Sequence, residues 1–164
     1  MLENKIDFMV TIEVREANAN GDPLSGNMPR TDAKGHGLIS DVAIKRKIRN
    51  RMQDFGHPTF VQAGDRIEDE FRSLEKRFSN QFNAKDSDED IEEKANKLWL
   101  DVRSFGQVFT YLKKSIGVRG PVSINMAKSL EPIVISSLQI TRSTNGMEAK
   151  NESGRSSDTM GMKY

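Results

Sequence analysis

The sequence predicts an α+β fold on three observations. Apolar and polar residues alternate strictly over residues 6–14, a period of two that is typical of a half-buried strand. Two stretches between residues 67 and 102 repeat apolar residues every three to four positions, as on one face of a helix. β-Branched residues dominate the run 133–141, which favours another strand. A length of 164 residues is enough for a single domain, 1–164.

The composition excludes several classes of protein. Because the chain has no cysteine, it has no disulfide, thiolate nucleophile or thiolate metal site. No apolar stretch approaches the roughly 18 residues of a membrane span, and the N-terminus lacks the pattern of a secretory signal. We therefore expect a cytoplasmic protein without a membrane partner. The 25 basic and 24 acidic residues nearly cancel, but residues 65–94 hold 6 basic and 11 acidic residues, so the remainder is basic.

A long segment of tight turns follows the first predicted strand. Between residues 17 and 37 the chain has three short clusters of the turn-forming residues Gly, Pro, Asn and Asp. Loops of this length are usually functional or disordered. Glycines let backbone N–H groups approach an anion, and Asn side chains donate to phosphate, ribose or base edges. The loop is therefore a candidate contact to a nucleic acid.

A helix with a cationic face is predicted from residue 41 to about residue 55. Ser40 is placed to cap its N-terminus, and the apolar stripe is Ile44, Ile48 and Met52. No acidic residue occurs between positions 42 and 53, whereas five basic ones do: Lys45, Arg46, Lys47, Arg49 and Arg51. Such charge runs are most often solvated surface, but a band of cations on a rigid helix also suits a phosphate backbone. Arg119, between two glycines, is a further candidate of this kind.

The later helices and strands follow from spacing. The two helical stripes are Ile67, Phe71, Leu74, Phe78 and Phe82, then Ile91, Ala95, Leu98 and Val102. Ser87 and Asp90 resemble a capping box at the start of the second helix. Residues 117–121 read as a turn-like loop, and residues 122–126 alternate as a short strand. Residues 142–163 hold few apolar side chains, which predicts a projecting hairpin or a mobile loop.

Catalytic machinery is sparse in this sequence. The two histidines, His36 and His57, lie beside glycine or proline, and neither a G-x-S-x-G motif nor a phosphate-binding P-loop occurs. Asp22, Asp32 and Asp41 could hold a hard divalent cation, but their spacing matches no calcium loop, and Asp is ordinary in turns. No metal and no cofactor is expected.

Six motifs occur in an order that is specific although each is weak alone. They are NANGDP (18–23), GNMPR (26–30), GHGL (35–38), KRKIRN (45–50), DVRSFG (101–106) and GVRGPVSI (117–124). In this order they resemble the repeated backbone subunit of CRISPR-associated Cascade complexes, most closely that of type I-C. The resemblance runs along essentially the whole chain.

The resemblance implies a ferredoxin-like core of the RNA-recognition-motif type, with a helical insertion at 62–102 and a protruding hairpin, the thumb, at 142–163. Family members are longer, so the core is incomplete and the chain is interpreted as C-terminally truncated. Apolar side chains on the thumb would wedge against a base or hold the hairpin on a neighbouring subunit. Those residues are Met147, Met160 and Met162.

The leading hypothesis is a non-catalytic scaffold that polymerises along CRISPR guide RNA and presents it for pairing with target DNA in antiviral defence. Its partners would be the guide RNA, target DNA, further copies of itself and other Cascade subunits. The expected RNA contacts are Asn18, Asn20, Arg30, Lys45, Arg46, Arg49 and Arg119. One alternative is a metal-dependent ribonuclease that uses Asp22 or Asp32. A third hypothesis is a soluble interaction protein that binds no nucleic acid.

Overall fold

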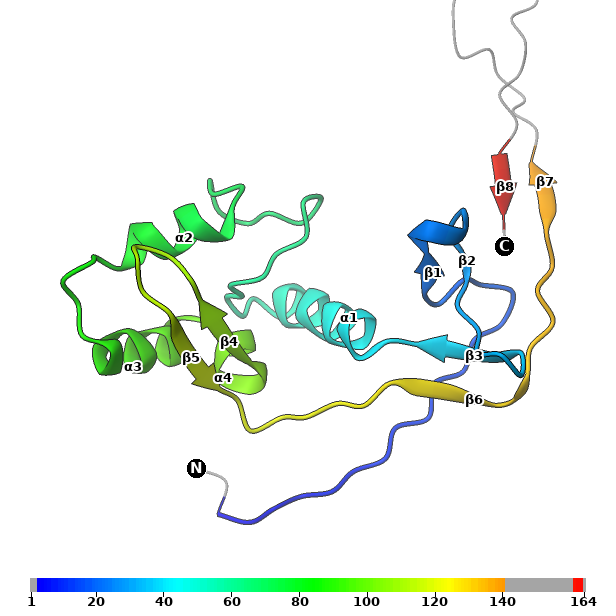
Figure 1. Ribbon diagram of the computed structural model, residues 1–164, viewed down its shortest axis with the longest axis horizontal. Coiled ribbons are helices and arrows are strands. Elements are labelled where there is room, and N and C mark those ends of the chain that lie inside the picture. Colours follow the sequence, from blue (N-terminus) through cyan, green and yellow to red (C-terminus); the bar gives the residue numbers. More distant parts are fainter. Residues whose placement is uncertain (1–2, 141–160, 164) are drawn as a thin grey trace, which may run out of the picture. The chain divides into compact units, whose positions relative to one another are not determined.

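The computed structural model describes residues 3–140 and 161–163 (Figure 1). These residues form helices and small two-stranded sheets, which confirms the mixed α+β prediction. The described residues separate into two compact units: Ser40–Ala127 form one, and the residues before and after this stretch form the other. Within the described ranges, no helix is long and apolar enough to cross a membrane.

The unit 40–127 contains four helices followed by a β-hairpin. The helices are α1 (Asp41–Asp54), α2 (Leu74–Gln81), α3 (Asp88–Leu98) and α4 (Leu100–Phe105), and the hairpin strands are β4 (Gly106–Phe109) and β5 (Ile116–Arg119). The antiparallel register places Gly106 opposite Arg119 and Phe109 opposite Ile116. Residues 117–119 therefore belong to a strand, and the turn predicted there from glycines was wrong.

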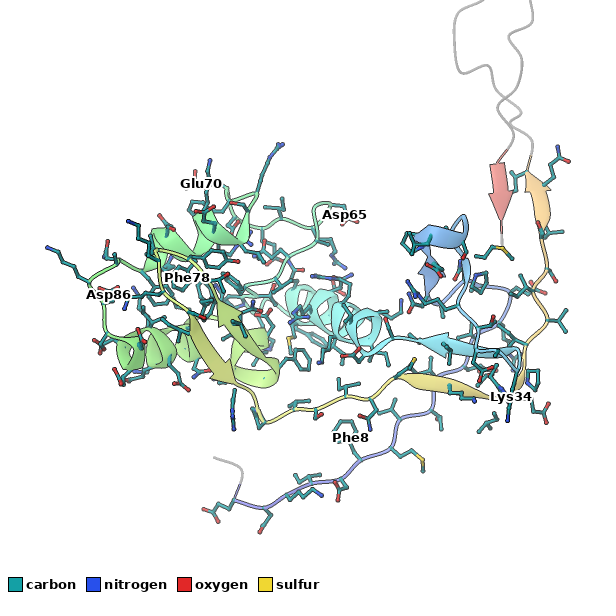
Figure 2. The ribbon with its side chains drawn as sticks, viewed as in Figure 1. Phe8, Lys34, Asp65, Glu70, Phe78 and Asp86 are labelled. Carbon is teal, nitrogen blue, oxygen red and sulfur yellow. The ribbon has the colours of Figure 1, made fainter. Side chains whose placement is uncertain are left out.

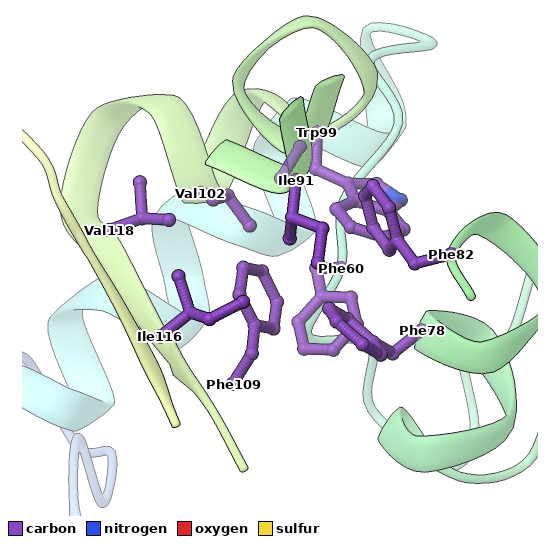
Figure 3. Packing of buried hydrophobic residues seen from close by; sticks show 10 residues of the cluster. Phe60, Phe78, Phe82, Ile91, Trp99, Val102, Phe109, Ile116 and Val118 are labelled. Atoms are coloured by element: carbon purple, nitrogen blue, oxygen red, sulfur yellow. The ribbon is translucent and has the colours of Figure 1, made fainter. Parts of the chain in front are cut away.

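Half of the buried core residues of this unit are aromatic (Figure 3). The Phe60 ring lies 4.7 Å from the ring of Trp99 and 5.2 Å from that of Phe109, measured between centroids. Phe78 packs on Phe109 at 4.8 Å. Offset and edge-to-face pairs of this kind stabilise beyond their buried area. The core thus joins the helices to the loop before α2 and to the hairpin.

Helix α1 begins where the sequence predicts. The Ser40 hydroxyl accepts a hydrogen bond from the Ala43 amide at 3.2 Å, and Asp41 lies in the first turn, where a carboxylate interacts favourably with the helix dipole. The Ser87 half of the capping box predicted for α3 is also confirmed: the Ser87 hydroxyl accepts from the Asp90 amide at 3.0 Å. Local side-chain to backbone bonds of this kind can be read from sequence.

The helix predicted from residue 67 is wrong in its first half, because α2 begins only after Ser73. Asp69 accepts from the Phe71 amide at 2.9 Å, which bends the chain instead of continuing a helix. The buried Arg77 guanidinium donates from Nη2 to Asp69 Oδ1 at 2.7 Å. This bond holds the pKa of the Asp69 carboxyl below its usual range.

The second unit is built from short strands. They are β1 (Gly21–Asp22), β2 (Met28–Pro29), β3 (His36–Ile39), β6 (Ala127–Pro132), β7 (Leu138–Ile140) and β8 (Gly161–Lys163), with a 3-10 turn, η1, at Pro23–Ser25. β1 pairs with β2, β3 with β6, and β7 with β8. The predicted run of tight turns is therefore present, but it carries strands of its own. The strand predicted at 133–141 is confined to β7, and the one at 122–126 is displaced to β6.

The strand predicted at 6–14 is not formed in the structure. Its apolar side chains are exposed, with Phe8 at 62% and Val10 at 68% of full exposure, and Phe8 is labelled in Figure 2. A strand exists only when a neighbour satisfies its backbone N–H and C=O groups. None of the described strands pairs with these residues, so the alternation has no sheet to join.

Most of the predicted thumb lies outside the described residues. This applies to Met147 and Met160, whereas Met162 is described only as backbone in β8, opposite Gln139 of β7. The two strands that flank residues 141–160 are paired antiparallel. β7 and β8 therefore lie side by side and run in opposite directions.

Candidate nucleic-acid interface

A buried carboxylate attaches the basic helix α1 to α4. Asp101, which is fully buried, accepts from Arg49 Nε at 2.8 Å and from the backbone amides of Phe60 and Val61 at 2.7 and 3.1 Å. The Arg49 side chain is only 11% exposed. A buried ion pair whose carboxylate also receives backbone donors holds elements in place. In this structure Arg49 therefore positions α1 on α4.

Phe105, the last residue of α4, lies against the cationic face of α1. The Lys45 ammonium is 5.9 Å and the Arg49 guanidinium 5.2 Å from the centroid of its ring. Both distances are within the range of a cation–π attraction. Lys45 is held further by an ion pair with Asp41 at 3.3 Å. The ring and its two cations therefore form one surface across α1 and α4.

Two glycines bring the β4–β5 hairpin against the end of α4. Gly106 has a φ of +76°, and a β-carbon there would lie 2.5 Å from the Val118 carbonyl oxygen. A β-carbon on Gly120 would lie 2.3 Å from the Gly106 nitrogen. Only glycine allows backbones to approach this closely. These positions thus serve a close backbone packing that the sequence analysis did not anticipate.

The surface at this junction has a shallow, open hollow. It is lined by Phe105 to Val108 on one side and by Val118 to Gly120 on the other. Arg119 is exposed, and within the described ranges its guanidinium forms no ion pair or hydrogen bond. We call this feature, with its cation Arg119 and its ring Phe105, the Phe105 hollow. Phe105, whose ring lies beside Lys45, thus lines the same hollow as Arg119.

The other cations of α1 differ in how exposed they are and in whether they already have a partner in the protein. Burial, followed by the nearby charge of Arg49, lowers the pKa of the Arg46 guanidinium, which nevertheless stays protonated at neutral pH. Arg46 Nη1 lies 3.5 Å from Asn50 Oδ1. Lys47 is exposed and forms no ion pair with the described residues. Arg51 pairs with Asp54 at 3.6 Å and stacks on Phe55.

Three predicted contacts lie in the other unit, on the loop that contains β1 and β2. Asn18 Nδ2 donates to the Asn27 carbonyl at 2.6 Å, and Asn20 Nδ2 to that of Gly21 at 3.4 Å. Arg30 pairs with Asp22 at 3.4 Å and remains 40% exposed. These amides fold the loop, and Arg30 is the one of the three with substantial exposed charge.

The two loop carboxylates considered as metal ligands, Asp22 and Asp32, accept hydrogen bonds from groups of the protein itself. Asp22 Oδ1 accepts from the Leu24 amide at 3.1 Å. Asp32 accepts from Lys128 Nζ at 2.6 Å and from the amides of Lys34 and His36. Lys128, followed by the His36 amide, holds the pKa of the Asp32 carboxyl well below its usual range. The described residues contain no cluster of three or more possible metal ligands.

Acidic residues concentrate on a different part of the unit 40–127. Three carboxylates lie in the first turn of α3, at Asp88, Glu89 and Asp90. Glu70, on the loop before α2, is also exposed (Figure 2). No carboxylate lines the Phe105 hollow. The charge asymmetry predicted from the sequence thus separates the α2–α3 region from the α1–α4–hairpin surface.

The comparison with protein families decides the relationship of this chain. The sequence profile of the family described as CRISPR-associated protein Cas7 matches residues 4–164. The chain belongs to this family. The resemblance predicted from the six motifs is thereby confirmed at the level of the Cas7 family.

A curated Cas7-family relative is also similar to the chain. The CRISPR-associated protein Cas7 of Haloferax volcanii is 28% identical over 115 residues, which cover 66% of this chain and 33% of that protein. The chain matches about a third of the length of this relative.

The sequence analysis missed two residues of this Cas7-family chain: Asp101, the buried partner of Arg49, and Phe105, the ring of the candidate surface. Asp101 and Phe105 both lie in the motif DVRSFG, which the sequence analysis used only as a mark of resemblance. For Asp101 a signal was available: an acidic residue directly before the buried Val102 is a candidate partner for a cation of the basic helix α1. The contact between Phe105 and α1 had no such signal, because it depends on how two helices pack.

Proposed function

We propose that this chain is the guide-RNA-binding part of a Cascade backbone subunit, most closely of type I-C, with no catalytic role of its own. The observation that carries the proposal is that Phe105 lies beside Lys45 and lines the same hollow as Arg119. Cations that are far apart in the sequence are held together there beside an aromatic ring. Single-stranded nucleic acids are bound by such combinations of positive charge and aromatic surface.

Membership of the Cas7 family supports a wider role within the same proposal. Several copies would polymerise along one guide RNA in the cytoplasm, together with other Cascade subunits, and leave bases free to pair with target DNA. The pairing of β7 with β8 supports a hairpin excursion at the place of the thumb. A ferredoxin-like core, with residues 62–102 as its insertion, belongs to the same proposal.

The engagement of the loop carboxylates supports a scaffold over a metal-dependent ribonuclease. A catalytic aspartate needs an oxygen that is free to bind a metal ion or accept a proton. The Asp32 carboxylate instead receives Lys128 and two backbone amides, and Asp22 receives Arg30 and the Leu24 amide. These contacts fold the loop and give no support to the alternative.

The proposal is tested by the salt dependence of RNA binding by a double variant, Lys45→Gln with Arg119→Gln. Each phosphate contact on a single strand contributes about 0.7 to the slope of log affinity against log salt. We expect the double variant to bind a labelled single-stranded RNA more weakly than the unmodified chain, with a slope smaller by about 1.4. Fluorescence anisotropy over a series of salt concentrations measures both quantities.

The matched control is Lys76→Gln, because Lys76 is an exposed cation on α2, away from the proposed surface. It should leave the affinity and the slope close to those of the unmodified chain. Arg49 is unsuitable for this test, since its removal would leave Asp101 buried without its partner. Equal slopes for the double variant and the control would contradict the proposal.

A further inference from the structure

We propose that the Phe105 hollow receives one base of the bound strand, packed on the Phe105 ring, while Arg119 binds the adjoining phosphate. This inference rests on the proposed function, because it assigns a nucleotide subsite to the same surface. It adds a contact that is apolar and therefore insensitive to salt. The two ideas can thus fail separately.

The first argument is that the Phe105 ring stands apart from the core. Phe60, Phe78, Phe82 and Phe109 are all buried in the aromatic cluster of Figure 3. Phe105 is outside that cluster and only half-buried, and it lines the hollow instead. A phenyl ring that contributes to a surface hollow and not to the core has apolar area available for a ligand.

The second argument is the chemistry of the hollow. Val108 is 59% exposed and extends the apolar surface beside the ring. Gly106 and Gly120 line the hollow and have no side chains to fill it. The nearby cations are Arg119 in the lining and Lys45 and Arg49 at the ring. Lys45 is paired with Asp41 and Arg49 with the buried Asp101, so Arg119 is the cation of the three without a counter-charge among the described residues.

This combination of groups matches a nucleotide. Its base has an apolar face for the ring, and its phosphate carries the negative charge that the guanidinium needs. A peptide segment would supply apolar area but would leave the exposed Arg119 guanidinium without a counter-charge unless it were acidic. Charge complementarity therefore favours a nucleotide of single-stranded RNA as the occupant.

Phe105→Leu tests the apolar contact without removing a charge. Stacking of a base on an aromatic side chain contributes enough that its removal weakens binding about fivefold or more. We expect this loss of affinity for a labelled single-stranded RNA, with an unchanged salt slope, because no phosphate contact is removed. Phe105→Tyr keeps the ring and should keep the affinity of the unmodified chain.

The chain offers a matched control in Phe55. This phenyl ring is also exposed and also carries a cation, Arg51, 4.4 Å from its centroid, but it does not line the hollow. Phe55→Leu should therefore leave RNA affinity unchanged. Far-ultraviolet circular dichroism of each variant verifies that the fold is retained.

A second measurement does not depend on a loss of affinity. Phe105→Trp places a fluorophore in the hollow, and Trp99, the only other tryptophan, is buried in the core and gives a constant background. Added RNA should quench the new emission, because a stacked base is an efficient quencher. The same RNA should not quench a tryptophan introduced by Phe55→Trp.

The outcomes separate the two proposals. The nucleotide subsite would be overturned if Phe105→Leu and Phe55→Leu bound RNA equally strongly and if RNA did not quench Phe105→Trp. Salt-dependent binding in that case would leave the proposed basic surface intact. If the unmodified chain bound no RNA, both proposals would fail together. Selective loss in Phe105→Leu with selective quenching in Phe105→Trp would support the subsite.

Discussion

At the scale of single residues, cations of one helix have different tasks. Arg49 and Lys45 are both basic residues of α1, but Arg49 is bound to the buried Asp101 and Lys45 lies on the Phe105 ring. Charge alone could not separate them, because the partner of Arg49 is 52 positions away in the sequence. The sequence could therefore predict which cations are candidates. It could not predict that Arg49 anchors α1 whereas Lys45 lies on the surface.

The anchoring role predicts a large effect of Asp101→Asn on stability. The substitution leaves the nearly buried Arg49 without a counter-charge, and an amide has only one oxygen for the donors that the carboxylate receives. Breaking a buried ion pair by removing one partner costs about 3 kcal/mol or more in the free energy of unfolding. Urea unfolding followed by the fluorescence of the buried Trp99 measures this loss.

Glu93→Gln is the control for this prediction. It removes the carboxylate of an exposed ion pair with Lys97 on α3, which should change the free energy of unfolding by no more than about 0.5 kcal/mol. If Asp101→Asn were no more destabilising than Glu93→Gln, Asp101 would not be an anchor of α1 on α4.

At the scale of elements, local signals explain where helices begin, and tertiary contacts explain the failures. Ser40 and Ser87 cap their helices as predicted, because a cap needs only neighbouring residues. The stripe from Ile67 is not helical before residue 74, since Asp69 binds both a backbone amide and the distant Arg77. A periodic pattern is thus overridden when a side chain finds a stronger partner elsewhere.

The junction of α4 with β4 predicts that Gly106→Ala is strongly destabilising. Gly106 has φ +76° and ψ 169°, a region that is essentially restricted to glycine, and a β-carbon would contact the backbone of Val118. The backbone conformation alone should cost about 1–3 kcal/mol. Thermal unfolding followed by circular dichroism should show a clearly lower Tm.

Gly117→Ala provides the comparison within the same hairpin. Gly117 lies in β5, and nothing stands within 4 Å of a β-carbon built there. Its substitution should be close to neutral, because a glycine inside a strand is slightly unfavourable to begin with. A Tm for Gly106→Ala equal to that for Gly117→Ala would show that the close approach of β4 to β5 and α4 is not required.

At the scale of the whole molecule, the predicted RNA contacts divide between the two units. Lys45, Arg46, Arg49 and Arg119 belong to the unit 40–127, whereas Asn18, Asn20 and Arg30 belong to the other. The mixed α+β class was predictable because apolar residues recur with a characteristic spacing in strands and with another in helices. The division into units was not, because it depends on contacts between distant segments, such as that of β3 with β6.

The most direct test of the central claim maps where RNA touches the chain. Ultraviolet cross-linking of a single-stranded RNA that carries 4-thiouridine, followed by mass spectrometry of the peptides, identifies the contacts. We predict cross-links in α1 and in the segment from Phe105 to Gly120. Cross-links confined to α2 and the acidic helix α3 would contradict the account.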